Sequence, residues 1–256
     1  MISINHENSN CSAIRVYNWN MTTLAAYFHN LCNEKMPSAA LDQFNQYQDE
    51  LLKWNSHFNL TAIRTPEEIE SKHFMDSLSL LPTLQKYQVK SLIDVGTGAG
   101  FPGIPLKIVD PTLKLVLVES VEKKAKFCQH IIQTLDLKDA SVMAERVEAI
   151  GQNKDYREQF DCAVARAVAA LPVLLEYLLP LVHVGGLVIA QKSAAVEDES
   201  KQAKNACAIL GGGKMQVEPV TIPGLEAERT LVIIEKVKPT PAAYPRRVGL
   251  PAKKPL

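Results

Sequence analysis

The stretch from residue 92 to residue 105, Leu-Ile-Asp-Val-Gly-Thr-Gly-Ala-Gly-Phe-Pro-Gly-Ile-Pro, most constrains what this chain can fold into. An apolar run ends at Asp94, and glycine then occupies every second position from 96 to 100. Glycine has no Cβ, so such a turn can adopt unusual dihedral angles and let a bulky cofactor lie against the backbone. Pro102 suits the first turn of a helix, where a missing N–H costs nothing. The segment predicts a buried strand, a ligand-binding turn and a helix.

The same segment fits two kinds of cofactor. The spacing Gly-x-Gly-x-x-Gly from Gly98 to Gly103, with Glu119 about twenty residues on, satisfies the dinucleotide fingerprint. In that fingerprint the helix N-terminus receives a pyrophosphate, which Asp94 would disfavour. S-adenosylmethionine has no phosphate and carries a sulfonium charge, and the pattern resembles the S-adenosylmethionine loop of class I methyltransferases. We expect S-adenosylmethionine, with a dinucleotide or a purely structural turn as alternatives.

Length and composition limit the class of protein. The chain has 256 residues, of which 46% are hydrophobic and 22% charged, enough for one large domain with or without a small appendage. Basic and acidic residues balance at 28 each, so any RNA contact must come from local patches. Five cysteines without a Cys-x-x-Cys pair indicate reduced thiols in the cytoplasm. We expect no signal peptide, membrane contact or metal site.

The first part of the chain has helical periodicity. Apolar residues recur at three- and four-residue spacing over 41–58, which gives one apolar face. The tetrapeptide 65–68, Thr-Pro-Glu-Glu, combines a cap, a first-turn proline and a capping-box acid. We expect a flexible N-terminus over 1–20 and a helical segment over 21–88 that packs on the core.

Beyond this segment, short apolar runs alternate with helical patterns. Such alternation predicts parallel strands with crossover helices on both faces, and a Pro-Gly turn at 223–224 predicts a final antiparallel hairpin. We therefore expect over 89–237 an α/β fold of the class I S-adenosylmethionine-dependent methyltransferase type, a Rossmann-like, mostly parallel seven-stranded sheet. In such sheets the ligand lies beyond the carboxyl ends of the strands. Strands are expected at 91–95, 114–119, 141–145, 161–165, 184–191, 215–221 and 229–237, and the clearest helices at 122–136 and 170–180.

The last residues, 238–256, form a basic tail rich in proline and without any acid. Proline at this density favours an extended segment over a packed element. Uncompensated cations on an extended chain suit a phosphate backbone. A solvated tail that aids solubility is the alternative.

Seven separated motifs occur in one order along residues 40–256. They are Lys53-Trp54-Asn55-x-x-Phe58-Asn59-Leu60-Thr61, His73-Phe74-x-Asp76-Ser77-Leu78, the glycine-rich run from Asp94 to Leu106, Arg146-Val147-Glu148, Ala165-Arg166-Ala167, Gly224-x-x-x-Glu228-Arg229 and Tyr244-Pro245-Arg246-Arg247-x-Gly249-x-Pro251-x-Lys253-x-Pro255. This set resembles the ribosomal RNA small subunit methyltransferase G family (glucose-inhibited division protein B), the guanine-N7 methyltransferases of 16S rRNA. Two departures are Ala165, where the family often has Ser, and Lys192-Ser193, where it often has Lys-Gly.

The resemblance implies methyl transfer from S-adenosylmethionine to N7 of a guanine in the 530 loop of 16S rRNA, at position 527 in the usual RNA numbering. The implied partner is 16S rRNA, free, in the small ribosomal subunit or in an assembly intermediate, with no obligate protein partner. The loop and the resemblance together give as cofactor-binding residues Asp94, Gly96, Gly98, Gly100, Phe101, Glu119, Ser120, Val121, Val147, Glu148 and Arg166. The expected RNA-binding residues are Lys192, Arg229, Lys238, Arg246, Arg247, Lys253 and Lys254.

Elementary chemistry supports some of these roles independently. The Glu119 carboxylate, at the end of the second strand, can accept both ribose hydroxyls, although it could also be a surface acid. Arg166 follows a buried strand, where an arginine rarely lies without a partner. That partner could be the methionine carboxylate, Asp94 or the target nucleotide, or Arg166 could form a structural salt bridge. His73 and Asp76 have no assigned role, because a lone His or Asp on a helix is usually structural.

Guanine N7 carries a free lone pair, so methyl transfer to it needs no general base. Catalysis can then depend on in-line placement, which supplies ~7–11 kcal/mol at best. No catalytic residue is assigned, and Arg166 is the best candidate for positioning. A dehydrogenase that binds NAD and a non-catalytic rRNA-binding assembly factor remain the alternative functions.

Overall fold

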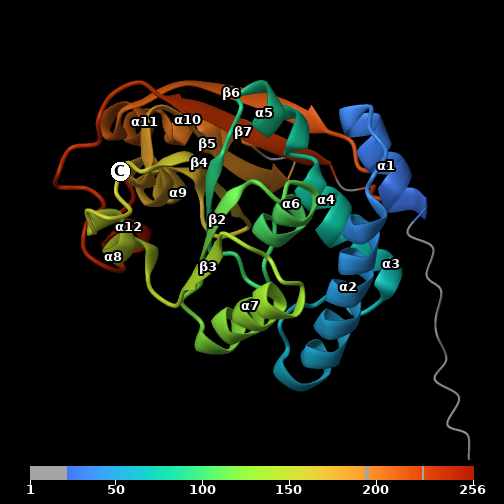
Figure 1. Ribbon diagram of the computed structural model, residues 1–256. Coiled ribbons are helices and arrows are strands. Elements are labelled where there is room, and N and C mark those ends of the chain that lie inside the picture. The colour runs from blue at the N-terminus through green and yellow to red at the C-terminus, as the bar shows by residue number, and fades with distance from the viewer. Residues whose placement is uncertain (1–21, 194–195, 227) are drawn as a thin grey trace, which may run out of the picture.

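A seven-stranded sheet forms the centre of the fold (Figure 1). The computed structural model describes residues 22–193, 196–226 and 228–256, so the predicted flexible N-terminus over 1–20 lies outside the described residues. The strand order is β3-β2-β1-β4-β5-β7-β6. Neighbours from β3 to β5 are parallel, and β7 is antiparallel to both β5 and β6. This confirms the predicted fold class, including the antiparallel last strand.

The strands lie where the apolar runs predict them, with ends that shift by a few residues. The largest shift is at the start of β6, three residues before the predicted run, and β5 continues two residues past its predicted run at both ends. The strands are β1 (Ser91–Val95), β2 (Lys114–Val118), β3 (Ala140–Met143), β4 (Phe160–Arg166), β5 (Val182–Ser193), β6 (Gly212–Val220) and β7 (Arg229–Lys236).

Helices cover both faces of the sheet, and each face has its own core. Successive strand residues point to opposite faces, so Leu92 enters one core and its neighbour Ile93 the other. The helices of the first face are α1 (Thr22–Cys32), α2 (Ser38–Phe58), α6 (Gly103–Val109) and α7 (Glu122–Thr134). Those of the second face are α8 (Val147–Gln152), α9 (Leu171–Leu178) with a 3-10 turn (Leu179–Leu181), α10 (Val196–Gln202) and α11 (Lys204–Leu210).

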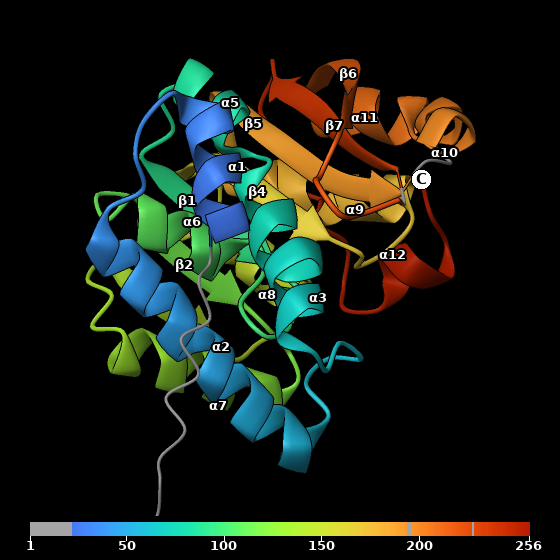
Figure 2. The ribbon, with the colours of Figure 1, turned by 90° about the vertical axis from the view of Figure 1, so that its right-hand side faces the viewer.

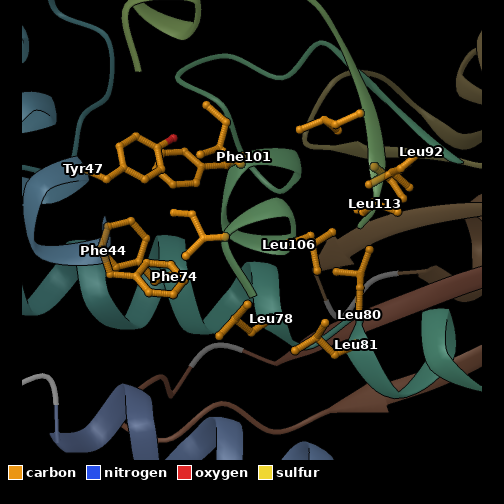
Figure 3. Packing of buried hydrophobic residues seen from close by; sticks show 14 of the residues in the cluster. Phe44, Tyr47, Phe74, Leu78, Leu80, Leu81, Leu92, Phe101, Leu106 and Leu113 are labelled. Carbon is orange, nitrogen blue, oxygen red and sulfur yellow. The ribbon is translucent and has the colours of Figure 1, made fainter. Parts of the chain in front are cut away.

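Helix α2 lies alongside α7 (Figures 1 and 2). Aromatic side chains of α2 pack on the glycine-rich loop and on Phe74. Tyr47 stacks on Phe101 with ring centroids 5.3 Å apart, and Phe44 packs on Phe74 at 4.9 Å (Figure 3). Tyr47, Phe44 and Phe74 are fully buried. The glycine-rich loop thus rests on the N-terminal helices, because Phe101 belongs to that loop.

The helix predicted from Thr65 begins there but is interrupted. The Thr65 hydroxyl accepts a hydrogen bond from the Glu68 N–H at 3.3 Å, as expected of a cap. The segments are α3 (Pro66–Ile69), a π-helical turn (Glu70–Met75), α4 (Asp76–Leu78) and α5 (Leu81–Lys86). A π-helical turn inserts one residue into the helical repeat and is frequent at functional sites. This turn contains His73 and ends beside Asp76.

The predicted extended tail is wrong. Residues 238–256, here called the C-terminal strap, fold back over the second face and include α12 (Leu250–Lys253) beside α8 (Figure 1). Arg246 donates three hydrogen bonds, at 2.6 to 2.8 Å, to the fully buried carboxylate of Glu176. The tail has no acid of its own, but acids elsewhere in the chain compensate part of its charge. The pairing could not be predicted from local sequence, because Arg246 and Glu176 lie 70 positions apart.

The Arg246–Glu176 pair gives a stability prediction. Removing one partner of a buried ion pair leaves an uncompensated charge and costs about 3 kcal/mol or more. We expect Arg246→Ala to lower the free energy of unfolding by about 3 kcal/mol in urea titrations. Arg247→Ala, at the exposed neighbouring position, is the control and should change it by about 0.5 kcal/mol or less. Equal losses for the two variants would contradict the prediction.

Candidate functional site

The glycine-rich loop is built around the carboxylate of Asp94 at the end of β1. Its Oδ2 accepts hydrogen bonds from the Thr97 hydroxyl at 2.6 Å and from the Gly103 N–H at 2.8 Å. Asp94 is fully buried, and its Oδ1 has no hydrogen-bond partner among the described residues. Burial raises the pKa of this carboxyl to about 6. Asp94 therefore joins the start of the loop to the start of α6 and does not line the cleft described below.

Pro102 is the residue before α6, one position earlier than predicted.

The loop glycines have distinct roles. Gly96, Gly98 and Gly100 all have positive φ, at 67°, 64° and 97°. A Cβ on Gly100 would lie 2.5 Å from side-chain atoms of Ile104 and Tyr47, so this glycine is needed for packing. A Cβ on Gly98 would have no atom within 4 Å, so the backbone there borders open space. The loop thus offers a bulky ligand a bare backbone surface.

Glu119, one residue after β2, binds the loop from the next strand. Its Oε2 accepts the Gly98 N–H at 3.0 Å, and its Oε1 accepts the Val121 N–H at 2.7 Å. A carboxylate has about four lone-pair sites, so each oxygen retains capacity for a ligand hydroxyl. Ser120 and Val121 follow and are exposed.

The predicted residues after β3 are buried in the protein. Val147 and Glu148 begin α8, and neither lines the cleft. Glu148 Oε1 accepts the Gly249 N–H of the C-terminal strap at 2.9 Å. Arg146, just before α8, donates to the Ser120 hydroxyl at 3.5 Å. The ends of β2 and β3 are thereby connected along the carboxyl edge of the sheet.

A cleft of about 790 Å³ opens beside the glycine-rich loop. Gly96, Gly98 and Phe101 line one side of it. Among the described residues, its charged lining consists of five basic and two acidic side chains, Lys72, Lys124, Arg166, Lys192, Arg229, Asp76 and Glu199. This excess of positive charge suits a polyanion.

Arg166, the last residue of β4, is held at the cleft by the π-helical turn. Its Nη1 donates to Asp76 Oδ2 at 2.7 Å and to the Lys72 carbonyl at 3.2 Å. Its Nη2 donates to His73 Nδ1 at 3.1 Å, and its guanidinium lies 5.2 Å from the centroid of the Phe101 ring. Of the partners considered from sequence, the structure shows the salt bridge, and the guanidinium still faces the cleft.

His73 is neutral and forms hydrogen bonds through both ring nitrogens, which link Arg166 to Thr61. Burial, and then the charge of Arg166, lower its pKa to about 3. Because Nδ1 accepts from Arg166, the proton lies on Nε2, which donates to the Thr61 hydroxyl at 3.0 Å. The ring stacks on Phe101 at 4.3 Å. A histidine in this state positions Arg166 and is not a base.

The predicted RNA-binding cations fall into two groups. Lys192 and Arg229 line the cleft, where Lys192 pairs with Glu199 at 2.8 Å and Arg229 approaches Asp76 at 3.4 Å. The other cations belong to the C-terminal strap, outside the cleft lining. Arg246 forms an ion pair with Glu176. The remaining strap cations, all exposed, are Lys238, Arg247, Lys253 and Lys254.

Several lining residues were missed from sequence. Gln191, whose amide donates to the Asp76 carbonyl at 2.8 Å, is a polar residue in an apolar strand, which is a usable signal. Other missed lining residues, Val168, Ala169 and Ala170 in the loop after Arg166, gave no such signal in the sequence. Ala167 has φ 56°, which is unusual for a residue with a Cβ, and a Cβ on Gly96 would lie 2.6 Å from Val168. Across the part of the chain that the structure describes, no group of three potential ligands could hold a metal ion.

Comparison with known proteins identifies related sequences. The family described as "GidB: rRNA small subunit methyltransferase G" matches residues 40–232. "Ribosomal RNA small subunit methyltransferase G" of Roseiflexus castenholzii is 50% identical over 222 residues, which cover 87% of this chain and 94% of that protein. The protein of the same name from Acetivibrio thermocellus is 50% identical over 216 residues, or 84% of this chain and 88% of that protein.

Solved structures with little sequence similarity share the fold. An O-methyltransferase from Bacillus cereus in complex with SAH has a TM-score of 0.54 at 17% identity and covers 85% of this chain and 100% of that chain. A putative O-methyltransferase from Klebsiella pneumoniae has a TM-score of 0.53 at 14% identity, with 84% and 96% covered. The chain therefore has the fold of these methyltransferases.

The buried carboxyl of Asp94 predicts how the stability of the protein depends on pH. Its pKa rises from the ordinary value of 3.8 to about 6 on folding, so the folded protein holds this proton more tightly than the unfolded chain does. Its contribution to stability is fully present below about pH 4 and is lost as the pH rises through 6, a change of about 3 kcal/mol. Asp94→Asn keeps an acceptor oxygen and removes the titration.

The measurement is urea unfolding of both proteins between pH 4 and 7. The stability of the natural chain relative to Asp94→Asn should fall across this interval, since groups common to both cancel. A difference that does not vary with pH would show that the carboxyl is not perturbed as predicted.

Proposed function

Because the chain belongs to the rRNA small subunit methyltransferase G family, we propose that it transfers a methyl group from S-adenosylmethionine to N7 of a guanine in 16S rRNA. One observation supports this most directly. The bare backbone of the glycine-rich loop and the cationic side chains line one cleft, so Gly96, Gly98 and Arg166 face the same space. A cofactor on the loop and an RNA on the cations would meet there.

The loop residues fit S-adenosylmethionine. Open space above Gly98 admits a bulky group, and the carboxylate of Glu119 beside it has spare acceptor capacity for ribose hydroxyls. In this proposal Gly96, Gly98 and Phe101 border the cofactor, with Glu119 to Val121 and the start of α8 along its adenosine part. Bound there, S-adenosylmethionine supplies a methyl group activated by its sulfonium. Asp94 and Gly100 contribute by shaping the loop.

Guanine N7 suits the groups that line the cleft. Among the described lining residues, each side chain that could accept a proton is already engaged. His73 lies between Arg166 and Thr61, Asp76 faces two arginines, and Glu199 pairs with Lys192. N7 has a lone pair and loses no proton before methylation, so it needs none of them as a base. What the cleft supplies is placement and positive charge.

The substrate form and the setting are part of the proposal. We place the target in the 530 loop of 16S rRNA, reached in the small ribosomal subunit or in an assembly intermediate, in the cytoplasm. Free thiols at the four described cysteines fit a reduced compartment. In the described ranges, every helix is too short or too polar to serve as a membrane span.

The direct test uses labelled S-adenosylmethionine and small subunits from a strain that lacks the protein. Transfer followed by mass mapping should locate the label on N7 of one guanine of the 530 loop. Fractions of different maturity, assayed side by side, identify the form of the substrate. Label on another atom or another RNA would refute the proposed target.

Arg166→Ala tests catalysis against a non-catalytic assembly role. Loss of the guanidinium frees Asp76 and His73 and misplaces the cleft wall, so we expect kcat/KM to fall about hundredfold. Arg166→Lys should fall similarly, because an ammonium cannot donate in the same planar fork. Lys214→Ala, on the exposed strand β6, is the control and should retain full activity. Full ribosome function with an inactive Arg166→Ala protein would favour the assembly role.

Lys192→Ala and Arg229→Ala test the contact of the cleft with RNA. Each removes one cation from the lining, so each should weaken binding to 16S rRNA and reduce its salt slope by about one. Filter binding across a salt series measures both quantities. Lys214→Ala again serves as control. An unchanged slope in both variants would place the RNA elsewhere.

A further inference from the structure

The short helix α8 depends on the C-terminal strap for its position. An isolated helix of six residues is not stable in water, so its placement comes from its contacts. At its start, Glu148 accepts the Gly249 N–H at 2.9 Å. At its end, Gln152 Nε2 donates to the Pro245 carbonyl at 2.7 Å. Gly151 lies so close to the strap that a Cβ there would be 2.7 Å from Pro245 Cγ.

Arg157 fastens the first half of the strap. Its guanidinium donates to the carbonyls of Thr240 at 2.8 Å, Pro241 at 3.2 Å and Tyr244 at 2.6 Å. The same group donates to the Gly151 carbonyl of α8 at 2.9 Å. One side chain thus joins the strap and α8.

Arg246 fastens the second half. Its bidentate pair with Glu176 of α9 fixes the chain just before α12, and its Nη2 also donates to the Lys254 carbonyl at 2.8 Å. Because the Glu176 carboxylate is fully buried, release of the strap would leave its charge buried without a partner. Gly249 lies between Arg246 and Lys254, which the hydrogen bond from Arg246 Nη2 holds together. Its φ of 79° favours glycine, and a Cβ there would point into open space.

The start of α8 lies at the edge of the sheet where a ligand binds. It follows the carboxyl end of β3, and Arg146 just before it contacts Ser120 after β2. We propose that the C-terminal strap is a positioning element of the cofactor site, which fixes the start of α8, and with it the adenine end of that site, through the Gly249–Glu148 hydrogen bond. The inference rests on the proposed function.

The strap therefore acts through its backbone. The groups that hold α8 are the Gly249 N–H and the Pro245 carbonyl, whereas the charges of Lys253 and Lys254 are exposed and form no ion pair among the described residues. A phosphate-binding tail would act through those charges. The two roles predict opposite behaviour for charge removal and chain shortening.

The experiment compares a chain that ends at Val248 with Lys253→Ala/Lys254→Ala in the full chain. The shortened chain keeps the Arg246–Glu176 pair and loses the Gly249 N–H. Calorimetry with S-adenosylmethionine should show about a tenfold loss of affinity for the shortened chain, the size expected of a hydrogen bond to a charged group. The lysine variant should bind the cofactor like the natural chain. In turnover assays KM for the cofactor should rise while kcat at saturation stays within about twofold.

A double-mutant cycle separates positioning from general destabilisation. Glu148→Ala should lose about as much affinity as the shortened chain, and combining the two should cost little more, because both break one interaction. Glu148→Gln keeps an acceptor for Gly249 and should retain most of the affinity.

The outcomes are distinguishable. Unchanged cofactor affinity in the shortened chain, or additive losses in the cycle, would overturn the inference alone. Loss of cofactor affinity in the lysine variant would also overturn it, because the charges would then matter. If the shortened chain does not fold, the pair Glu148→Ala and Glu148→Gln decides, and equal losses in the two contradict the inference. A natural chain that binds no S-adenosylmethionine would instead overturn the proposed function.

Discussion

The ion pair between Arg166 and Asp76 joins the N-terminal helices to the carboxyl edge of the sheet. Asp76 is almost completely buried, so its charge needs cations, and these come from β4 and β7. The pairing draws the π-helical turn against the glycine-rich loop and forms a wall of the cleft. It also fixes the proton of His73, because the Arg166 guanidinium occupies Nδ1. Loop, cleft and histidine thus depend on one contact between residues ninety positions apart.

Buried carboxylates serve different purposes along this edge. Asp94 organises the loop and is driven towards its neutral form by burial, whereas Asp76 stays paired with arginine. Glu119 is satisfied by backbone N–H groups and keeps spare acceptor sites. No described lining residue is left as a free base. This arrangement suits a reaction that is limited by placement, because the protein need only hold the methyl donor and the acceptor base in line.

Local rules predicted the local parts of this molecule. Short apolar runs located each strand of the sheet, because successive strand residues enter two different cores and both faces are therefore apolar. The glycine spacing located the loop, because its glycines have positive φ. Local rules failed where partners are distant in sequence. The acid that neutralises Arg246 lies 70 positions earlier, so the tail looked uncompensated. The π-helical turn was invisible too, because one inserted residue barely disturbs an apolar stripe.

The strap has a consequence for how the protein folds. Glu176 is fully buried, and its cation, Arg246, lies 70 positions later in the sequence, beyond the last strand of the sheet. Until Arg246 reaches it, this carboxylate has no cation and resists burial. The second face can therefore reach its final packing only when the strap docks. Closure of this core is thus coupled to a contact that the sheet itself does not make.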